Sequence, residues 1–213
     1  MEPTIRPQNI HKKYLLVGGM ALLLGFGLNA KTHAMGFGDL LQGSAAFLTH
    51  MVTHETGHHL VANMVDGEDV RMDFFKSQGG NFFLGLSSAR GIAPESILPF
   101  RAAGVVASNH LFNMALVNYR RTATTYNKAL LFFSGTDFLW YSVWSFYIKG
   151  SNNPSYDPVG IAQETGLSHH AITGAAFLHT AINFYRAYSG NDTLVPYFTL
   201  DDERANFGVS VHF

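Results

Sequence analysis

Residues 47–60 read FLTHMVTHETGHHL, and this stretch decides both the fold and the chemistry that we expect. Residues 54–58 form an H-E-x-x-H motif. Side chains four residues apart on a helix lie on one face, so His54 and His58 can bind the same Zn²⁺ ion. Glu55 follows the first of these ligands, and we expect it to act as the general base on a zinc-bound water.

The composition narrows the kinds of site that the chain can build. The sequence has 213 residues, of which 47% are hydrophobic and 14% are charged, against roughly a quarter charged in an average protein. Its 14 Lys and Arg against 15 Asp and Glu exclude a basic nucleic-acid-binding surface. It contains no cysteine, so disulfides and thiolate metal sites are excluded as well. Any metal must therefore be held by histidine and carboxylate groups.

Long runs with few charges predict the fold class. A membrane-spanning helix needs about 20 mostly apolar residues, and several runs approach this length. We therefore predict a mainly α, polytopic membrane helical bundle of about four or five apolar helices that contacts the lipid bilayer. The expected location is the bacterial inner membrane, as an integral protein. The runs are residues 14–30, 40–65, 102–119, 129–148 and 165–185.

The first run has two interpretations. Lys12 and Lys13 precede an apolar stretch, and small residues follow near Ala34. Residues 1–34 thus fit either a first transmembrane helix or a cleaved secretory signal peptide. The second interpretation predicts a periplasmic or secreted protein instead.

No linker or repeat divides the chain, so residues 1–213 are expected to form a single domain. Within it, residues 70–75 and 82–87 predict a small β-hairpin after the H-E-x-x-H helix. Ser168 is placed to cap an additional helix over residues 165–187. Alternating residues near the C-terminus predict short strands within residues 193–213.

The quoted helix resembles the first active-site helix of the intramembrane site-2 protease family. A hairpin-like stretch follows it here, as is common in that family. Residues 103–109, Ala-Gly-Val-Val-Ala-Ser-Asn, are similar to the family's Ala-Gly-Pro…Asn segment, with Val105 in place of the proline. The resemblance covers residues 40–148 and implies that they form the catalytic core of an intramembrane zinc metalloprotease.

The resemblance also implies an aspartate from a later helix as the third zinc ligand, although the family's Leu-Asp-Gly tripeptide is absent. Asp137 is its best counterpart, because it is the only acid in residues 129–148. An unpaired carboxylate in such a run would be costly, and a metal ion would satisfy it. Asp157, in a loop beside a proline, and His179 are the alternatives. Further candidates for supporting the ligands or binding substrate are His50, Asn109, His110 and His179.

These observations lead to one main hypothesis and two alternatives. The main hypothesis is zinc-dependent hydrolysis of peptide bonds within or next to the membrane, with one Zn²⁺ per chain and membrane proteins or peptides as substrates. The first alternative is an exported, soluble H-E-x-x-H metallopeptidase. The second is a membrane protein that binds zinc or a partner without catalysis.

Overall fold

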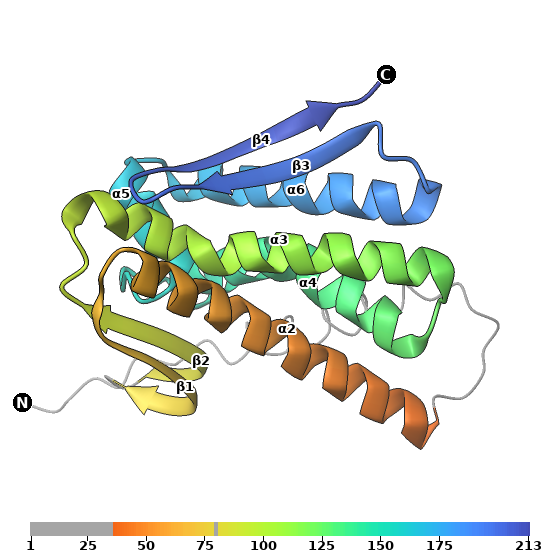
Figure 1. The fold of residues 1–213 in the computed structure, drawn as a ribbon, viewed down its shortest axis with the longest axis horizontal. Coiled ribbons are helices and arrows are strands. Elements are labelled where there is room, and N and C mark those ends of the chain that lie inside the picture. Colours follow the sequence, from red (N-terminus) through yellow and green to blue (C-terminus); the bar gives the residue numbers. More distant parts are fainter. Residues whose placement is uncertain (1–35, 79–80) are drawn as a thin grey trace, which may run out of the picture. The chain divides into compact units, whose positions relative to one another are not determined.

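The computed structural model describes residues 36–78 and 81–213 (Figure 1). Within these residues the chain is mainly helical, with two antiparallel hairpins. The elements in chain order are α2 (Phe37–Met64), β1 (Glu68–Gln78), β2 (Asn81–Arg90), a 3₁₀ turn (Pro94–Ser96), α3 (Ile97–Arg121), α4 (Thr125–Val143), a π-helical turn (Trp144–Ile148), α5 (Asp157–Thr165), α6 (His169–Ser189), β3 (Leu194–Leu200) and β4 (Ala205–Val211).

Local sequence signals explain where several helices begin and end. The Thr124 hydroxyl accepts the backbone N–H of Asn127 at 3.1 Å and caps the start of α4. The Ser168 hydroxyl accepts the N–H of Ala171 at 3.2 Å, so the predicted cap of α6 is confirmed. Helix α6 ends at Ser189 and is followed by Gly190, whose φ of 71° lies in the left-handed region that glycine adopts without strain.

The long helices pack side by side, and a glycine allows a close contact between two of them. Helix α2 packs against α3 and α4, and α4 packs against α6 (Figure 1). A Cβ atom on Gly57 of α2 would collide with the backbone carbonyl of Ala103 and lie 2.7 Å from Cβ of Ala107. The absence of a side chain at Gly57 therefore lets the H-E-x-x-H face of α2 approach the backbone of α3.

Both predicted β segments are present as two-stranded antiparallel hairpins. Strands β1 and β2 pair with Phe74 opposite Gly85, and β2 packs against α2. Strands β3 and β4 pair with Tyr197 opposite Gly208, and β3 packs against α6 and α3. The first hairpin lies close to the H-E-x-x-H helix, and the second covers the opposite side of the helices (Figure 1).

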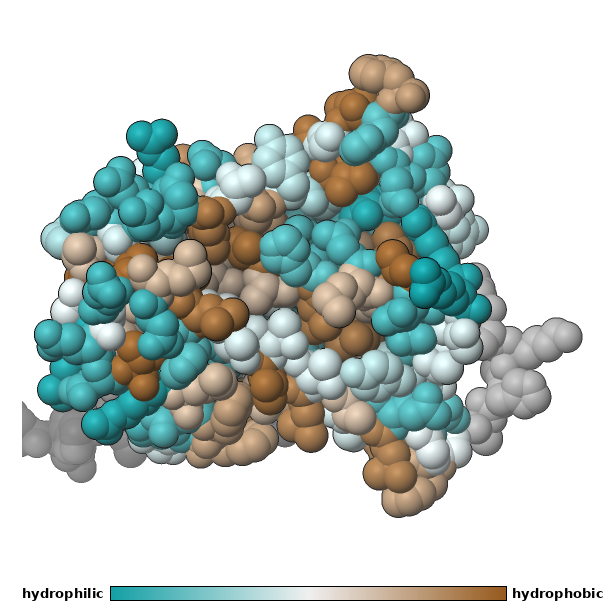
Figure 2. Space-filling model, in the orientation of Figure 1, coloured by the Kyte–Doolittle hydropathy of each residue, from teal (hydrophilic) through white to brown (hydrophobic). Residues whose placement is uncertain are grey.

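The predicted polytopic membrane bundle is wrong, and so is the predicted integral membrane location. In residues 36–78 and 81–213, no helix has both the length and the apolarity that crossing a membrane requires. The runs were defined by missing charges, but uncharged polar side chains interrupt them, such as Thr49, His50 and Thr53 in α2. Figure 2 accordingly shows hydrophobic and hydrophilic residues interspersed on one face. The expected transmembrane helix or signal peptide at residues 1–34 lies outside the described residues.

Candidate metal centre

Three buried ligand atoms converge where α2 meets the start of α5. The Nε2 atoms of His54 and His58 each lie 3.0 Å from Oδ2 of Asp157. The two Nε2 atoms are 3.3 Å apart. All three side chains are buried. The four-residue spacing on α2 aligns the histidines, as predicted, and the first turn of α5 supplies the carboxylate.

The other nitrogen of each imidazole is held by a hydrogen-bond partner. Nδ1 of His54 lies 2.9 Å from Oδ2 of Asp137 on α4. Nδ1 of His58 lies 2.6 Å from the backbone carbonyl oxygen of Phe100 on α3. Metal-binding histidines usually donate their second ring N–H to a carboxylate or a carbonyl, which fixes the ring orientation. Both rings of the motif are therefore oriented with Nε2 directed to the same point.

A glycine leaves the space in front of these nitrogens open. A Cβ atom on Gly104 of α3 would lie 2.5 Å from Nε2 of His58 and closer still to Nε2 of His54. Any other residue at this position would put a methyl or larger group where a metal ion would bind. The close packing of α2 on α3 at Gly57 thus brings a backbone segment without a side chain next to the ligands.

The chemistry of the three ligands also fits a metal ion. With Nδ1 of His58 bonded to the carbonyl oxygen of Phe100, its Nε2 faces Asp157 and His54. Nε2 lies 3.0 Å from a carboxylate oxygen of Asp157, so one metal ion can be shared by the two groups. Two imidazoles and a carboxylate are a common ligand set for catalytic zinc, which keeps its remaining position open.

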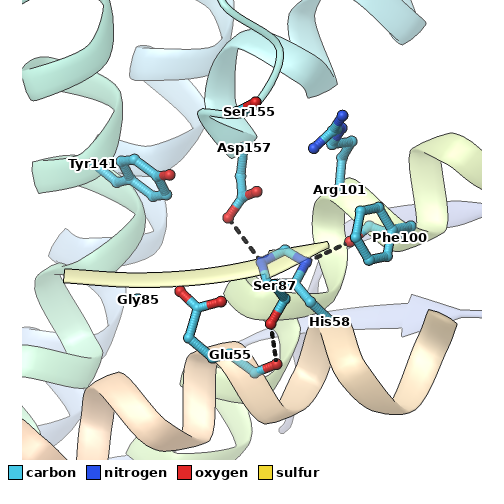
Figure 3. A pocket seen from close by; sticks show the side chains of 9 residues that line it. All are labelled: Glu55, His58, Gly85, Ser87, Phe100, Arg101, Tyr141, Ser155 and Asp157. Carbon is cyan, nitrogen blue, oxygen red and sulfur yellow. Dashed lines mark hydrogen bonds and ion pairs between the residues drawn. The ribbon is translucent and has the colours of Figure 1, made fainter. Parts of the chain in front are cut away.

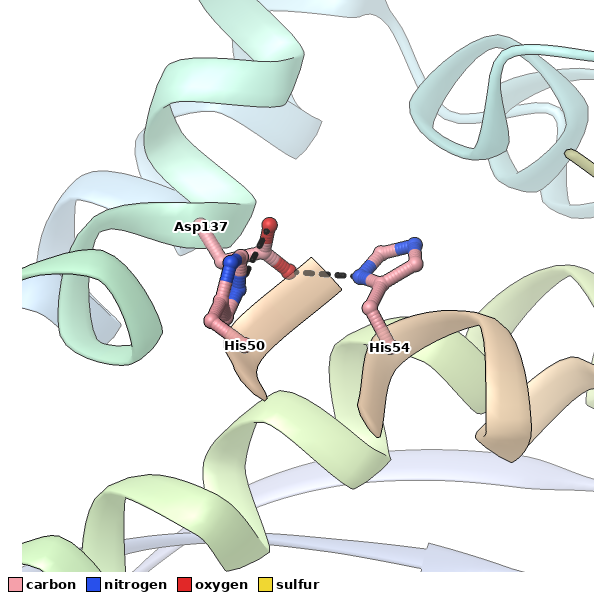
Figure 4. Close-up of side chains that lie close together, drawn as sticks. All are labelled: His50, His54 and Asp137. Atoms are coloured by element: carbon pink, nitrogen blue, oxygen red, sulfur yellow. Dashed lines mark hydrogen bonds and ion pairs between the residues drawn. The ribbon is translucent and has the colours of Figure 1, made fainter. Parts of the chain in front are cut away.

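A second histidine–carboxylate cluster adjoins the first through His54 (Figure 4). Oδ1 of Asp137 lies 3.2 Å from Nε2 of His50, which is one turn before His54 on α2. The Ser108 hydroxyl lies 3.3 Å from both His50 Nε2 and His54 Nδ1. His50, His54 and Asp137 are thus close enough to form a metal-sized group of their own. Unlike the first group, this one uses the Nδ1 side of His54.

The charges around His54 favour a positive charge on its imidazole ring. Burial lowers the pKa of His54, but the neighbouring Asp137 and Asp157 raise it well above its ordinary value. Burial would raise the pKa of Asp137, yet the charges of His54 and His50 hold it well below its usual range. The pKa of Asp157 is likewise lowered by His58 and His54 despite its burial. The histidines thus favour the ionised form of both aspartates, and a metal ion would take the place of a ring proton among these groups.

A small, open pocket lies beside the metal centre (Figure 3). The Glu55 carboxylate faces it, and a Cβ atom on Gly85 of β2 would lie 2.5 Å from Oε1 of Glu55. The hydroxyl of Ser87 donates to the backbone carbonyl of Glu55 at 2.9 Å and ties β2 to α2. The lining residues are Glu55, His58, Gly85, Ser87, Phe100, Arg101, Tyr141, Ser155 and Asp157.

Tyr141 supplies a phenol to this pocket from α4. Its ring contacts the imidazole of His54, with ring centroids 5.9 Å apart, and the phenol ring of Tyr156, with ring centroids 6.1 Å apart. Burial raises the pKa of Tyr141 well above its ordinary value, and the negative charges of Asp157 and Glu55 raise it further. The phenol therefore keeps its proton and can donate a hydrogen bond into the pocket.

The structure brings the predicted site residues together in groups that differ from the predicted ones. His54, Glu55 and His58 come together as expected. Asp157, the alternative third ligand, reaches the Nε2 atoms, whereas Asp137, the preferred one, contacts Nδ1 of His54 and is joined by His50.

The remaining candidates lie elsewhere. Asn109 and His179 meet each other, with Oδ1 and Nε2 2.9 Å apart, in a separate buried cluster between α3 and α6. His110, on the following position of α3, is exposed to solvent.

Sequence reasoning missed Tyr141 and Arg101. Their helical spacing from other site residues could have indicated both: Tyr141 follows Asp137 by four residues, and Arg101 precedes Gly104 by three. Side chains at these spacings share a helix face. The sequence did not indicate, however, that these faces of α3 and α4 meet at the H-E-x-x-H motif.

Comparison with known proteins adds no relative: no family model, no curated protein and no solved structure matches this chain. The resemblance to the site-2 protease family stays a prediction that rests on the quoted residues.

Proposed function

We propose that this chain is a zinc-dependent peptidase whose metal ligands are His54, His58 and Asp157. One observation carries the proposal: both Nε2 atoms of the H-E-x-x-H motif converge within 3.3 Å on each other and on Asp157, beside a pocket that Glu55 lines. Asp137 then has a different role from the one that the sequence suggested. It orients His54 through Nδ1 and stabilises its charge.

Zinc bound at these ligands would act as a Lewis acid that lowers the pKa of a water molecule and polarises the scissile carbonyl. Glu55 is placed to accept a proton from the attacking water, because its carboxylate faces the same pocket. No described side chain donates a hydrogen bond to this carboxylate, so it is free to take the proton. As the C–N bond breaks, Glu55 returns that proton to the leaving amine.

Tyr141 stabilises the negative charge that develops on the carbonyl oxygen during attack. Its phenol keeps its proton next to Asp157 and Glu55, and it approaches the pocket from the side opposite Arg101 (Figure 3). A fixed donor in a buried site stabilises a developing oxyanion far more than a mobile water does. Removal of one such donor typically lowers kcat by about 10²–10³.

A peptide substrate is supported by the strand that borders the site. Strand β2 contributes Gly85 and Ser87 to the pocket and pairs with β1 on only one side within the described residues. Its other edge presents backbone N–H and C=O groups to which an extended peptide can add as a further strand. Gly85 lets the substrate backbone and the Glu55 carboxylate approach each other closely.

The test is Glu55→Gln in the full-length chain. The variant should bind zinc as well as the unsubstituted protein, because Glu55 is not a ligand. Hydrolysis of a mixed peptide library, followed by mass spectrometry, should fall by about 10²–10⁴-fold because the general base is lost. Glu164→Gln, at an exposed position on α5, is the matched control and should be fully active. Undiminished proteolysis by the Glu55 variant would refute the proposed function.

A further inference from the structure

Arg101 is the one cationic side chain among the residues that line the pocket. It lies on α3, one turn before Gly104, and reaches the pocket on the side of Asp157 opposite Tyr141 (Figure 3). Its stem is held in place: a Cβ atom on Gly160 of α5 would lie 2.8 Å from Cδ of Arg101. The guanidinium carbon lies 5.4 Å from the ring centroid of Phe100.

This guanidinium lacks an anionic partner in the described part of the chain. Its Nε is buried without a hydrogen-bond partner, and no carboxylate among these residues forms an ion pair with it. Arg186, a buried arginine on α6, shows the contrast: it contacts Asp192 at 2.8 Å and Asn113 at 2.9 Å. A partly buried arginine is costly to leave unpaired, so the pairing of Arg101 is expected to come from a ligand.

The chemistry of the guanidinium indicates which ligand. Arg101 is a permanent cation whose Nε has no hydrogen-bond partner within the described residues, so an anion that can accept hydrogen bonds would satisfy it. The planar guanidinium pairs best with a carboxylate, which it can bind through two parallel N–H···O bonds.

We propose that Arg101 binds a carboxylate of the peptide substrate and selects substrates that carry one next to the scissile bond. This assignment rests on the proposed peptidase function. The carboxylate is either the C-terminus, which makes the enzyme a carboxypeptidase, or an acidic side chain, which makes it an endopeptidase with acidic specificity. Arg101 has the same role in both cases.

The binding test uses the zinc-loaded, full-length Glu55→Gln protein, which does not consume its ligands. It is mixed with N-acetylated tetrapeptide libraries that end in either a free carboxylate or a carboxamide, and retained peptides are identified by mass spectrometry. Carboxylate-bearing peptides should be enriched about 10- to 100-fold, the range of a charge-assisted bidentate contact. Enrichment of the free C-terminus indicates the first source, and enrichment of Asp- or Glu-containing carboxamides indicates the second.

Two variants assign the selectivity to Arg101. Arg101→Met keeps the packing on Phe100 without the charge and should bring the enrichment close to one. Arg121→Met, at an exposed position of the same helix, should leave it unchanged. If the parent protein retains carboxamides without Asp or Glu as well as it retains carboxylate-bearing peptides, or if the enrichment survives in Arg101→Met, the assignment is overturned.

Parallel cleavage assays with active Glu55 separate this assignment from the proposed function. Arg101-dependent binding without any hydrolysis would reject the peptidase and keep the carboxylate site. Hydrolysis without any preference for carboxylates would keep the peptidase and reject the carboxylate site.

Discussion

His54 and His179 are both buried histidines on long helices, yet their surroundings give them opposite properties. His54 lies between two carboxylates, and their charge raises its pKa well above the ordinary value despite burial. His179 lies between two amides, with Nε2 2.9 Å from Oδ1 of Asn109 and 3.0 Å from Nδ2 of Asn183. Burial lowers its pKa to about 4, and the charge of Arg186 adds to this, although Asp137 opposes it.

The difference shows that the neighbours, and not burial, separate a candidate metal ligand from a structural histidine. Carboxylates around His54 stabilise a positive charge on the ring, whether a proton or a metal ion provides it. The amides around His179 contact its Nε2 and provide no compensating charge, while its Nδ1 is buried without a hydrogen-bond partner among the described residues. The first region is therefore suited to bind a cation, and the second to join α3 and α6.

The largest expected effect is the loss of the metal centre through a change at one glycine. Gly104→Ala would place a methyl group 2.5 Å from Nε2 of His58. We expect zinc affinity, measured by calorimetry on the purified chain, to fall at least about 100-fold, which exceeds the usual effect of altering a supporting residue.

Gly174→Ala is the matched control on α6, the helix of His179. A Cβ atom there would meet nothing within 4 Å, so zinc binding should be unchanged. Normal zinc affinity in Gly104→Ala would show that the metal binds somewhere else.

A smaller effect is expected when His54 loses its charged partner on the Nδ1 side. Asp137→Asn keeps an oxygen that can accept from His54 but removes the negative charge. Zinc affinity should fall about 10- to 100-fold, as is usual for residues that support a metal-binding histidine. Asp192→Asn, which alters a carboxylate beside Arg186 in the other region, should have no effect on zinc affinity. If Asp137→Asn instead abolishes binding, Asp137 itself is a ligand.

The smallest expected effect concerns the pH dependence of stability in the His179 region. The pKa of His179 is about 4 in the folded chain and about 6.5 in an unfolded one. Between these values the unfolded chain binds more protons, so the free energy of unfolding decreases as the pH falls through this window. From pH 7 to 5.5 the loss due to His179 should be about 1 kcal/mol.

His179→Gln isolates this contribution, because all other titrating groups are common to both proteins. Urea unfolding of the metal-free chains at the two pH values should show a decrease about 1 kcal/mol smaller in the variant. Equal pH dependence in the two proteins would mean that His179 does not stay neutral in the fold.

The parts of the molecule that depend on local sequence could be predicted. The H-E-x-x-H spacing aligned His54 and His58. Turn residues predicted the first hairpin, alternation predicted the C-terminal strands, and Ser168 was predicted to cap α6. Asp157 was ranked below Asp137 because its proline-flanked segment suited a turn, whereas its actual position depends on how α5 packs against α3, which no local pattern encodes. The membrane prediction was wrong for a related reason: it counted missing charges along each run, whereas the thermodynamic cost of insertion also depends on uncharged polar side chains.

The central claim is that His54, His58 and Asp157 together hold one metal ion. A crystal structure of the full-length chain loaded with one equivalent of zinc, with anomalous diffraction recorded at the zinc edge, tests it most directly. We predict a single anomalous peak about 2.0–2.2 Å from both Nε2 atoms and from a carboxylate oxygen of Asp157, with Asp137 still bonded to Nδ1 of His54. A peak bound by His50 and Asp137, or no peak at the H-E-x-x-H motif, would contradict the account.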